Sequence, residues 1–141
     1  MWPVTFEERL QQWHALRVTA SGLLDQNRYL TINDWWFTAP MINQHIRWNA
    51  FPNWPGPWEL LDQDRWCTLA RALGIVYTLM MIDETYQHRL SIVQNNDDNL
   101  VLVDNGKYIL NWCPKELLNI NSQHFTPSQS IACDKLYSLI E

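Results

Sequence analysis

The longest helical pattern of the chain runs from Asp62 to Val93 and reads DQDRWCTLARALGIVYTLMMIDETYQHRLSIV. Apolar residues recur in it at the three- and four-residue spacing of a helix, and they make one face broadly apolar. They include Trp66, Leu69, Leu73, Val76 and Met80. Asp62 or Asp64 can cap the first turn with its side chain. The stretch therefore predicts the strongest helical region of the fold.

Gly74 lies in the middle of this pattern and leaves two interpretations open. It is either a point where another element packs closely on the helix or a break between two helices. Farther along, Asp83-Glu84 can cap a new helix that carries Tyr86, Leu90 and Val93. The apolar run Gly74–Ile82 is too short to span a lipid bilayer.

Helical signals also dominate the N-terminal part of the chain. Thr5 followed by Glu8 is a capping-box pattern, and the apolar spacing after it predicts a helix from Phe6 to about Gln26, weakened by Gly22. We expect a short helix at about Asp34–Thr38. Pro40 can open a further helix. The apolar face of that helix would be Met41, Ile42, His45, Ile46 and Trp48.

The segment Ala50–Trp58 holds three Pro and one Gly in nine residues. Such a composition excludes a regular helix or a central strand. Because the segment also carries Phe51, Trp54 and Trp58, we expect an extended strap that packs on the core.

One β-hairpin is expected between Leu100 and Trp112, because Asn105-Gly106 separates two apolar, partly β-branched runs. Thr126-Pro127 then begins a C-terminal helix that continues to about Ile140. The sequence as a whole predicts a mainly α fold. It would be an irregular helical domain of five or six helices with one hairpin near 100–112, and residues 1–141 would form a single globular domain.

Charge and the N-terminus narrow the class of protein. Lys and Arg number 10 against 15 Asp and Glu, which gives a formal net charge of −5. This balance argues against a general nucleic-acid or membrane-surface binder, since both need concentrated positive charge. The first residues carry no basic, apolar secretory signal. Three Cys at spacings that match no zinc or redox motif are expected to be reduced and mostly buried. We therefore expect a cytoplasmic protein that meets a membrane only through a partner.

A search for catalytic residues favours no enzyme and no cofactor. His14, His45, His88 and His124 lack partners at a metal-ligand spacing. Cys67 follows Arg65, which can lower the pKa of its thiol, but no general base is near it in the sequence. The paired carboxylates lie at predicted helix starts or in a polar loop, where capping explains them. The sequence therefore predicts no catalytic, metal-binding or cofactor-binding residue.

Tryptophan is the unusual feature of the composition, with nine in 141 residues. Trp13 and Trp66 fit a core assignment. Five others fall close together in the sequence, and we expect at least two of them to contact a partner protein, because Trp is enriched at binding hot spots. These candidate partner-binding residues are Trp35, Trp36, Trp48, Trp54 and Trp58. A pocket for a carbohydrate or another small ligand is the alternative.

The segment Leu69-Ala-Arg71-Ala-Leu73-Gly74-Ile-Val-Tyr77, with Glu84 and His88-Arg89 after it, resembles one in the SctK group of type III secretion accessory proteins. This group includes the YscK-like and OrgA/MxiK-like proteins. Its members carry a Leu-x-Arg-x-Leu-Gly apolar helix with a basic end, and tryptophan-rich stretches punctuated by proline.

The resemblance implies a cytosolic sorting-platform protein that links an inner-membrane ring protein to the pod of SctQ-type and SctL-type components. It implies no reaction, no cofactor and no transferable site residue.

Two functions therefore remain open. The first is a non-enzymatic adaptor or scaffold subunit of a bacterial protein-secretion apparatus, with ring and pod proteins as partners. The alternative is a small acidic immunity or inhibitor protein that binds a basic toxin. An enzyme that uses Cys67 is disfavoured, because no base is visible.

Overall fold

The structure is a computed structural model, and it describes residues 2–41, 46–62, 66–119 and 127–140. The described α-helices all lie in the first part of the chain, and the described strands follow them, with a 3₁₀-helix at the end. In chain order the elements are α1 (Phe6–Ser21), α2 (Asp25–Trp36), η1 (Trp48–Ala50), α3 (Pro57–Asp62), α4 (Thr68–Ile82), η2 (Glu84–His88), β1 (Leu90–Asn95), β2 (Asp98–Val103), β3 (Tyr108–Cys113), β4 (Glu116–Leu118), β5 (Gln129–Ala132) and η3 (Cys133–Ile140), where η denotes a 3₁₀-helix.

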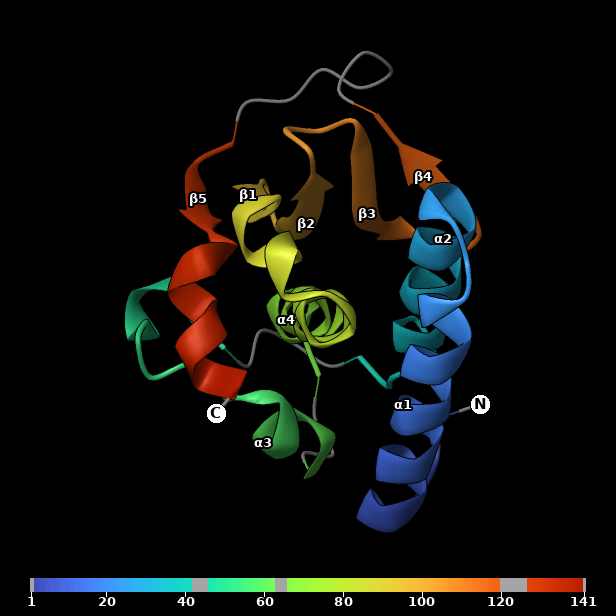
Figure 1. Ribbon diagram of the computed structural model, residues 1–141. Coiled ribbons are helices and arrows are strands. Elements are labelled where there is room, and N and C mark those ends of the chain that lie inside the picture. Colours follow the sequence, from blue (N-terminus) through green and yellow to red (C-terminus); the bar gives the residue numbers. More distant parts are fainter. Residues whose placement is uncertain (1, 42–45, 63–65, 120–126, 141) are drawn as a thin grey trace.

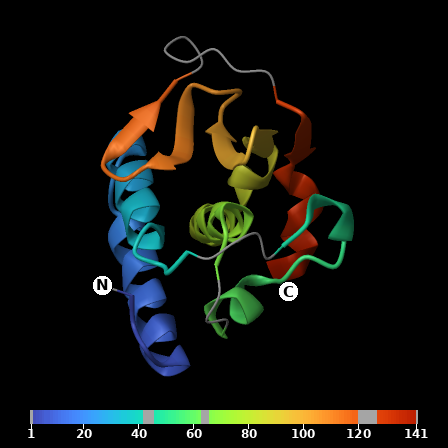
Figure 2. The same cartoon turned by 180° about the vertical axis from the view of Figure 1, so that it is seen from behind.

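Helix α4 lies beneath the sheet, with α1 and α2 along one side of it and η3 along the other (Figures 1 and 2). All residues of α4 from Leu69 to Met80 are buried. A helix that is apolar on nearly every side must be enclosed, because any exposed face would leave apolar surface in water. Its apolar sequence therefore makes α4 the centre around which the other elements pack.

The strands of the described residues form one antiparallel sheet in the order β4-β3-β2-β1-β5. The β1–β2 and β2–β3 turns place Asn96, Asp104 and Asn105 at positive φ angles of 57°, 53° and 60°. Asn and Asp tolerate this left-handed region better than other residues with a side chain. The hairpin predicted from Asn105-Gly106 is confirmed as β2–β3.

Two tryptophans hold α1 and α2 to α4 through one hydroxyl group. The indole N–H groups of Trp13 on α1 and Trp36 on α2 both donate to Thr78 Oγ1, at 2.8 and 3.0 Å. The Thr78 hydroxyl in turn donates to the Gly74 carbonyl at 2.7 Å. The Trp36 ring lies so close to Gly74 that a Cβ there would meet its carbons at 2.6–2.7 Å. Gly74 is thus a close-packing point within one helix and does not break it.

The prediction of a mainly α fold with one hairpin is wrong, because β1, β4 and β5 extend the hairpin into a five-stranded sheet. Leu90 and Val93, expected on a helix after Asp83, belong to β1. Of the helix expected to begin at Asp83-Glu84, only η2 is helical, and Asp83 caps its start through the Thr85 N–H at 3.0 Å. The central helix itself is shorter than predicted, since Cys67 caps it and it ends at Ile82.

The predicted C-terminal helix is also corrected. Residues Gln129–Ala132 pair with β1 as an edge strand, and only Cys133–Ile140 are helical, as a 3₁₀-helix. A capping pattern is a local signal, and here pairing with the open edge of β1 overrides it. The starting residue of that prediction, Thr126, lies outside the described residues.

The N-terminal predictions need smaller corrections. The helix expected from Phe6 to about Gln26 ends at Ser21, where Gly22 follows, and a second helix begins at Asp25. That helix includes most of the short helix expected at Asp34–Thr38. Of the helix expected after Pro40, residues 42–45 lie outside the described residues, and Met41 instead forms a parallel bridge with Trp66.

The strap prediction is confirmed in its main feature. Trp54 is 3% exposed and its indole N–H donates to the Arg47 carbonyl at 2.8 Å. The strap then passes the backbone of Leu139 on η3 so closely that only a glycine, Gly56, fits there. Its last residues, from Pro57, are already helical in α3.

Replacing Gly74 with alanine tests the close contact with Trp36. We expect Gly74→Ala to lower the free energy of unfolding by about 2 kcal/mol in urea titrations, because the indole must shift in a packed core. Gly22→Ala is the matched control, since a Cβ there meets only the Thr19 carbonyl at 3.6 Å. Equal stability of the two variants would contradict the packing described above.

Candidate functional site

The five tryptophans predicted to contact a partner lie on different elements and differ in exposure. Trp36 on α2 and Trp54 in the strap are 1% and 3% exposed, so both belong to the core. Trp35 and Trp48 are half-buried, and Trp58 at the start of α3 is 45% exposed. Partner contact through Trp36 or Trp54 is therefore not supported by their burial, whereas Trp58 is accessible.

Adjacent Trp35 and Trp36 are accommodated by a tryptophan that the sequence analysis did not single out. The ring of Trp2 lies 4.9 Å from Trp35, 5.8 Å from Trp36 and 5.1 Å from Trp66, measured between centroids. Trp35 and Trp36 are perpendicular to each other at 4.9 Å. Trp2 of the N-terminal segment thus covers the tryptophan rings of α2 and the Trp66 ring that precedes α4. Trp13 and Trp66 are both 0% exposed, which confirms their core assignment.

Trp58 is an exposed side chain with a rigid support. Its ring packs edge-on against Trp13 with centroids 5.6 Å apart, and Trp13 is held by Thr78. The Arg17 guanidinium lies 4.3 Å over the Trp13 ring, and burial lowers the pKa of Arg17. The exposed residues Glu59 and Asp62 follow Trp58 on α3.

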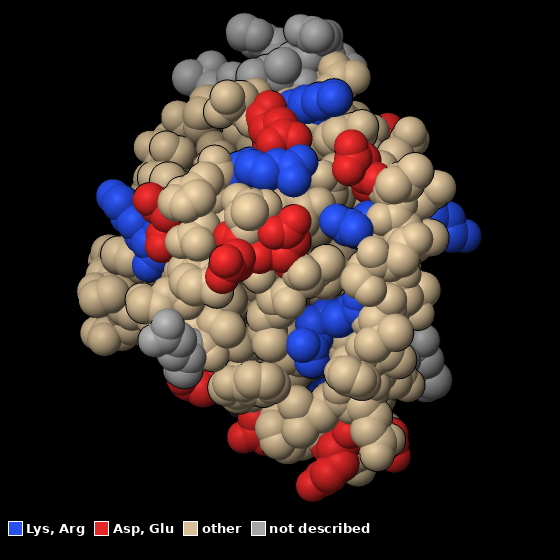
Figure 3. Space-filling model, in the orientation of Figure 1, with Lys and Arg blue, Asp and Glu red and all other residues tan. Residues whose placement is uncertain are grey.

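Acidic side chains gather at the end of the molecule where α1 begins and α3 lies, at the bottom of Figure 3. The first turn of α1 contributes Glu7 and Glu8, and α3 contributes Glu59 and Asp62. Arg9 fastens the two helices here, since its guanidinium donates to the Leu61 carbonyl at 3.0 Å. Trp58 therefore shares the short helix α3 with two of these exposed carboxylates.

Cys67 occupies the N-cap position of α4, and its sulfur accepts the Ala70 N–H at 3.5 Å. The thiol is 95% buried, as the sequence predicted for most of the cysteines. The next residue, Thr68, accepts a hydrogen bond from Asn99 of β2 at 2.8 Å, and Asn111 of β3 donates to the Thr68 carbonyl at 3.0 Å. The thiol therefore lies beside a cluster of amide side chains where α4 meets the sheet.

Asn111 is the centre of this buried amide cluster. Its φ angle of 70° at an irregularity of β3 carries the side chain inward, where it accepts from Arg71 Nε and donates to the Asn99 carbonyl at 2.6 Å. Asn33 on α2 accepts the Asn111 N–H at 2.8 Å. Burial lowers the pKa of Arg71 to about 10, and its guanidinium lies over the Phe37 ring at 3.6 Å. This cluster joins α2, α4, β2 and β3.

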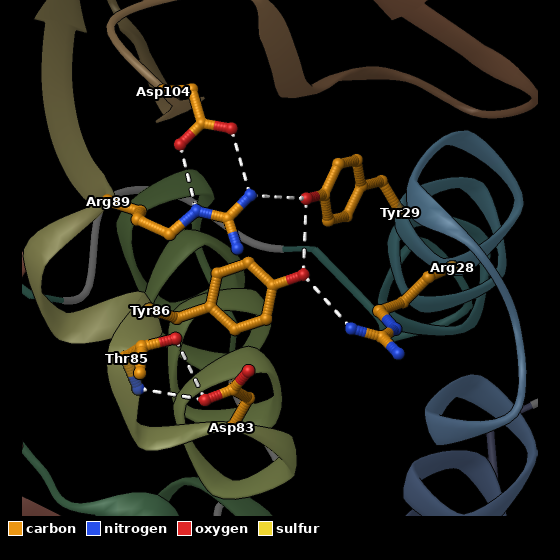
Figure 4. A network of polar contacts seen from close by, with 7 residues as sticks. All are labelled: Arg28, Tyr29, Asp83, Thr85, Tyr86, Arg89 and Asp104. Carbon is orange, nitrogen blue, oxygen red and sulfur yellow. Dashed lines mark hydrogen bonds and ion pairs between the residues drawn. The ribbon is translucent and has the colours of Figure 1, made fainter.

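A second polar network lies where η2 meets the end of β2 (Figure 4). Arg89 donates to both carboxylate oxygens of Asp104, at 2.8 and 2.9 Å, and to the Tyr29 hydroxyl at 3.4 Å. The Tyr29 and Tyr86 hydroxyls are 3.1 Å apart, and Arg28 donates to Tyr86 at 3.1 Å. Arg89 lowers the pKa of Asp104, and burial raises the pKa of Tyr29. Every group here has a protein partner, so the network serves the fold.

Metal-binding and membrane-spanning features are the remaining site types to consider. In the described parts of the chain, no group of three or more His, Cys, Asp or Glu side chains could hold a metal ion. His14 and His88 are exposed, whereas His45 and His124 lie outside the described residues. Among the described residues, no helix is both long and apolar enough to cross a membrane.

Comparisons of this chain with family models, with curated proteins and with solved structures find no match. The candidate site is therefore assigned from geometry, and the resemblance to the SctK group stays a prediction.

Sequence reasoning missed the amide cluster and the pairing of Trp58 with Trp13. The sequence does contain a signal for the amide cluster, because Asn111 lies between Leu110 and Trp112 in a run that is otherwise apolar. A polar residue inside a core strand indicates a buried hydrogen-bond network, because an unpaired amide there is unfavourable.

The Arg89–Asp104 pair predicts a specific pH dependence. Both side chains are about one-third exposed (34% and 35%). We therefore expect Asp104→Asn to lower the free energy of unfolding by about 1 kcal/mol at neutral pH. Because the native pKa of Asp104 is lowered, the difference persists above the unfolded-state pKa of about 4 and disappears as the pH falls through the native value.

Urea titrations between pH 7 and pH 2 measure this difference. Asp97→Asn, in the exposed β1–β2 turn, removes the same charge and serves as the control. A wild-type advantage over Asp104→Asn that persisted at the lowest pH would show that the ion pair is not its source.

Proposed function

We propose that this chain is a non-enzymatic protein-binding subunit, an adaptor that presents Trp58 to a partner protein. The observation that carries the proposal is the 45% exposure of a tryptophan whose ring is fixed against the buried Trp13. Exposed aromatic side chains that are already ordered lose little conformational entropy on binding, and Trp is enriched among binding hot spots.

The surroundings of Cys67 support the non-enzymatic part of the proposal. A cysteine nucleophile needs a neighbouring base or an exposed thiolate. The thiol is 5% exposed and caps α4, and the side chains at this end of α4 include Asn99, Asn111 and Arg71, with the exposed Asp98 raising the pKa of Arg71 against the larger lowering by burial. Neither amide can take a proton at neutral pH, and Arg71 remains charged there, because its lowered pKa of about 10 is still well above neutrality.

The acidic residues at the α1–α3 end of the molecule favour a second candidate function, an inhibitor or immunity protein for a basic toxin. Glu59 and Asp62 follow the exposed Trp58 on α3, and the first turn of α1 adds Glu7 and Glu8. A basic active-site surface would complement this charge. The two candidates differ in what the partner is and in how association depends on salt.

The resemblance to the SctK group suggests which assembly to test first. Under the adaptor proposal, the ring and pod components of a type III secretion sorting platform are the partners, in the cytoplasm. Under the inhibitor proposal, a single basic enzyme is the partner, and its association rate falls steeply as salt rises.

The decisive experiment uses the tagged full-length chain in its host and compares wild type with Trp58→Ala and Trp112→Ala. Co-purifying proteins are identified by mass spectrometry, and each one is then measured in purified form. We expect the affinity of the true partner to fall at least about tenfold with Trp58→Ala. Trp112, on β3 and 37% exposed, is the control, and its replacement leaves the affinity unchanged.

Thermal unfolding of Trp58→Ala, with Trp36→Ala as a core variant for comparison, separates binding from folding. Trp36→Ala is expected to lower the free energy of unfolding by about 3–5 kcal/mol, because it empties a core position. Trp58→Ala is expected to lower it by far less, since the side chain is 45% exposed. A partner that binds Trp58→Ala as tightly as wild type would refute the adaptor surface.

A further inference from the structure

A pocket of about 420 Å³ lies apart from Trp58, between η1 and the β1–β5 edge of the sheet. Arg47, Trp48 and Asn49 line it from one side, and Gln94 of β1 and Gln129 of β5 from the other. Its volume is within the range of small-ligand pockets. The described residues of the lining contribute one aromatic ring, three amide side chains and one guanidinium group.

Trp48 is fixed from behind by the interior. Its indole N–H donates to Asn99 Oδ1 at 2.7 Å, and Asn99 donates to Thr68 on α4 at 2.8 Å. Trp54 packs nearly perpendicular to the Trp48 ring, at 5.4 Å between centroids, and donates to the Arg47 carbonyl. The ring that borders the pocket is therefore positioned before any ligand arrives.

The opposite wall is ordered in the same way. Gln94 and Gln129 are directly paired across β1 and β5, and Gln129 Nε2 donates to Gln94 Oε1 at 2.8 Å. The Ser128 hydroxyl lies 3.3 Å from the same oxygen. Two amide side chains are thus held at the pocket by the strand register.

We propose that this pocket binds a saccharide, with Arg47 favouring a sugar that carries a carboxylate. Amide groups both donate and accept hydrogen bonds, as sugar hydroxyls do, and an indole offers a flat apolar surface to the C–H groups of a sugar ring. An apolar ligand would leave the remaining hydrogen-bonding groups of the amides without a partner. A phosphorylated ligand is a poorer match, because Arg47 is the single cation among the described residues of the lining.

The test titrates the full chain with glucuronic acid and with glucose, and follows the backbone amides of Gln94 and Gln129 by NMR. We expect glucuronic acid to shift these resonances with a dissociation constant near the millimolar range, and glucose to bind about fivefold more weakly. Trp48→Ala and Gln129→Ala abolish the shifts, and Trp112→Ala, outside the pocket, retains them.

Several outcomes decide the proposal. Equal binding of the two sugars would overturn the role of Arg47 and keep the saccharide site. Neither sugar shifting these amides, or unchanged shifts in Gln129→Ala, would overturn the site itself. Gln129 is exposed on an edge strand, so this variant is informative even if Trp48→Ala fails to fold. The proposal is independent of Trp58, and its failure leaves the adaptor function standing.

Discussion

One hydroxyl group, that of Thr78, sets the arrangement of the helices. It accepts the indole N–H groups of Trp13 and Trp36 and donates to the Gly74 carbonyl, so all of its hydrogen-bonding capacity is used inside the core. Large indole rings bury much apolar surface, but each also carries a polar N–H that needs a partner when buried. A single threonine on α4 meets that need for two helices at once.

The same helix supports both surfaces to which we assign binding. Trp58 packs on Trp13, whose orientation Thr78 fixes near the middle of α4. Trp48 is tied through Asn99 to Thr68, in the first turn of α4. The two surfaces are thus separate on the outside of the molecule, and both are supported by the buried helix α4. This support explains how the proline-rich segment, which is largely irregular, can still present ordered aromatic side chains.

The sequence was informative where a pattern is local. The central helix, the hairpin at Asn105-Gly106 and the capping of α1 all follow from residues near one another in the chain. The role of Gly74 stayed open between close packing and a helix break, because the ring that packs on it belongs to Trp36, far away in the sequence. The sheet was missed because β4 and β5 are short and β1 lacks alternation: Ile92 and Val93 are both buried, one on each face of β1. The pairing of β5 with β1 joins residues that are distant in sequence, so no local signal announces it.

The candidate site was predicted less well than the fold, because exposure of a tryptophan depends on what covers it. Trp36 and Trp58 look alike in the sequence, yet Gly74 admits the first into the core and α3 holds the second at the surface. The composition led us to expect that some tryptophans contact a partner, but only the tertiary packing distinguishes the buried tryptophans from the exposed ones.

The most direct test of this account compares Thr78→Val with Thr78→Ser by urea unfolding. Valine keeps the shape of threonine and removes the acceptor of two buried indole N–H groups, whereas serine keeps the hydroxyl. We predict that Thr78→Val is less stable than Thr78→Ser by at least about 2 kcal/mol, and that the difference shrinks when Trp13 and Trp36 are replaced by Phe. If Thr78→Val were as stable as Thr78→Ser, the hydroxyl would not be what holds α1 and α2 to α4.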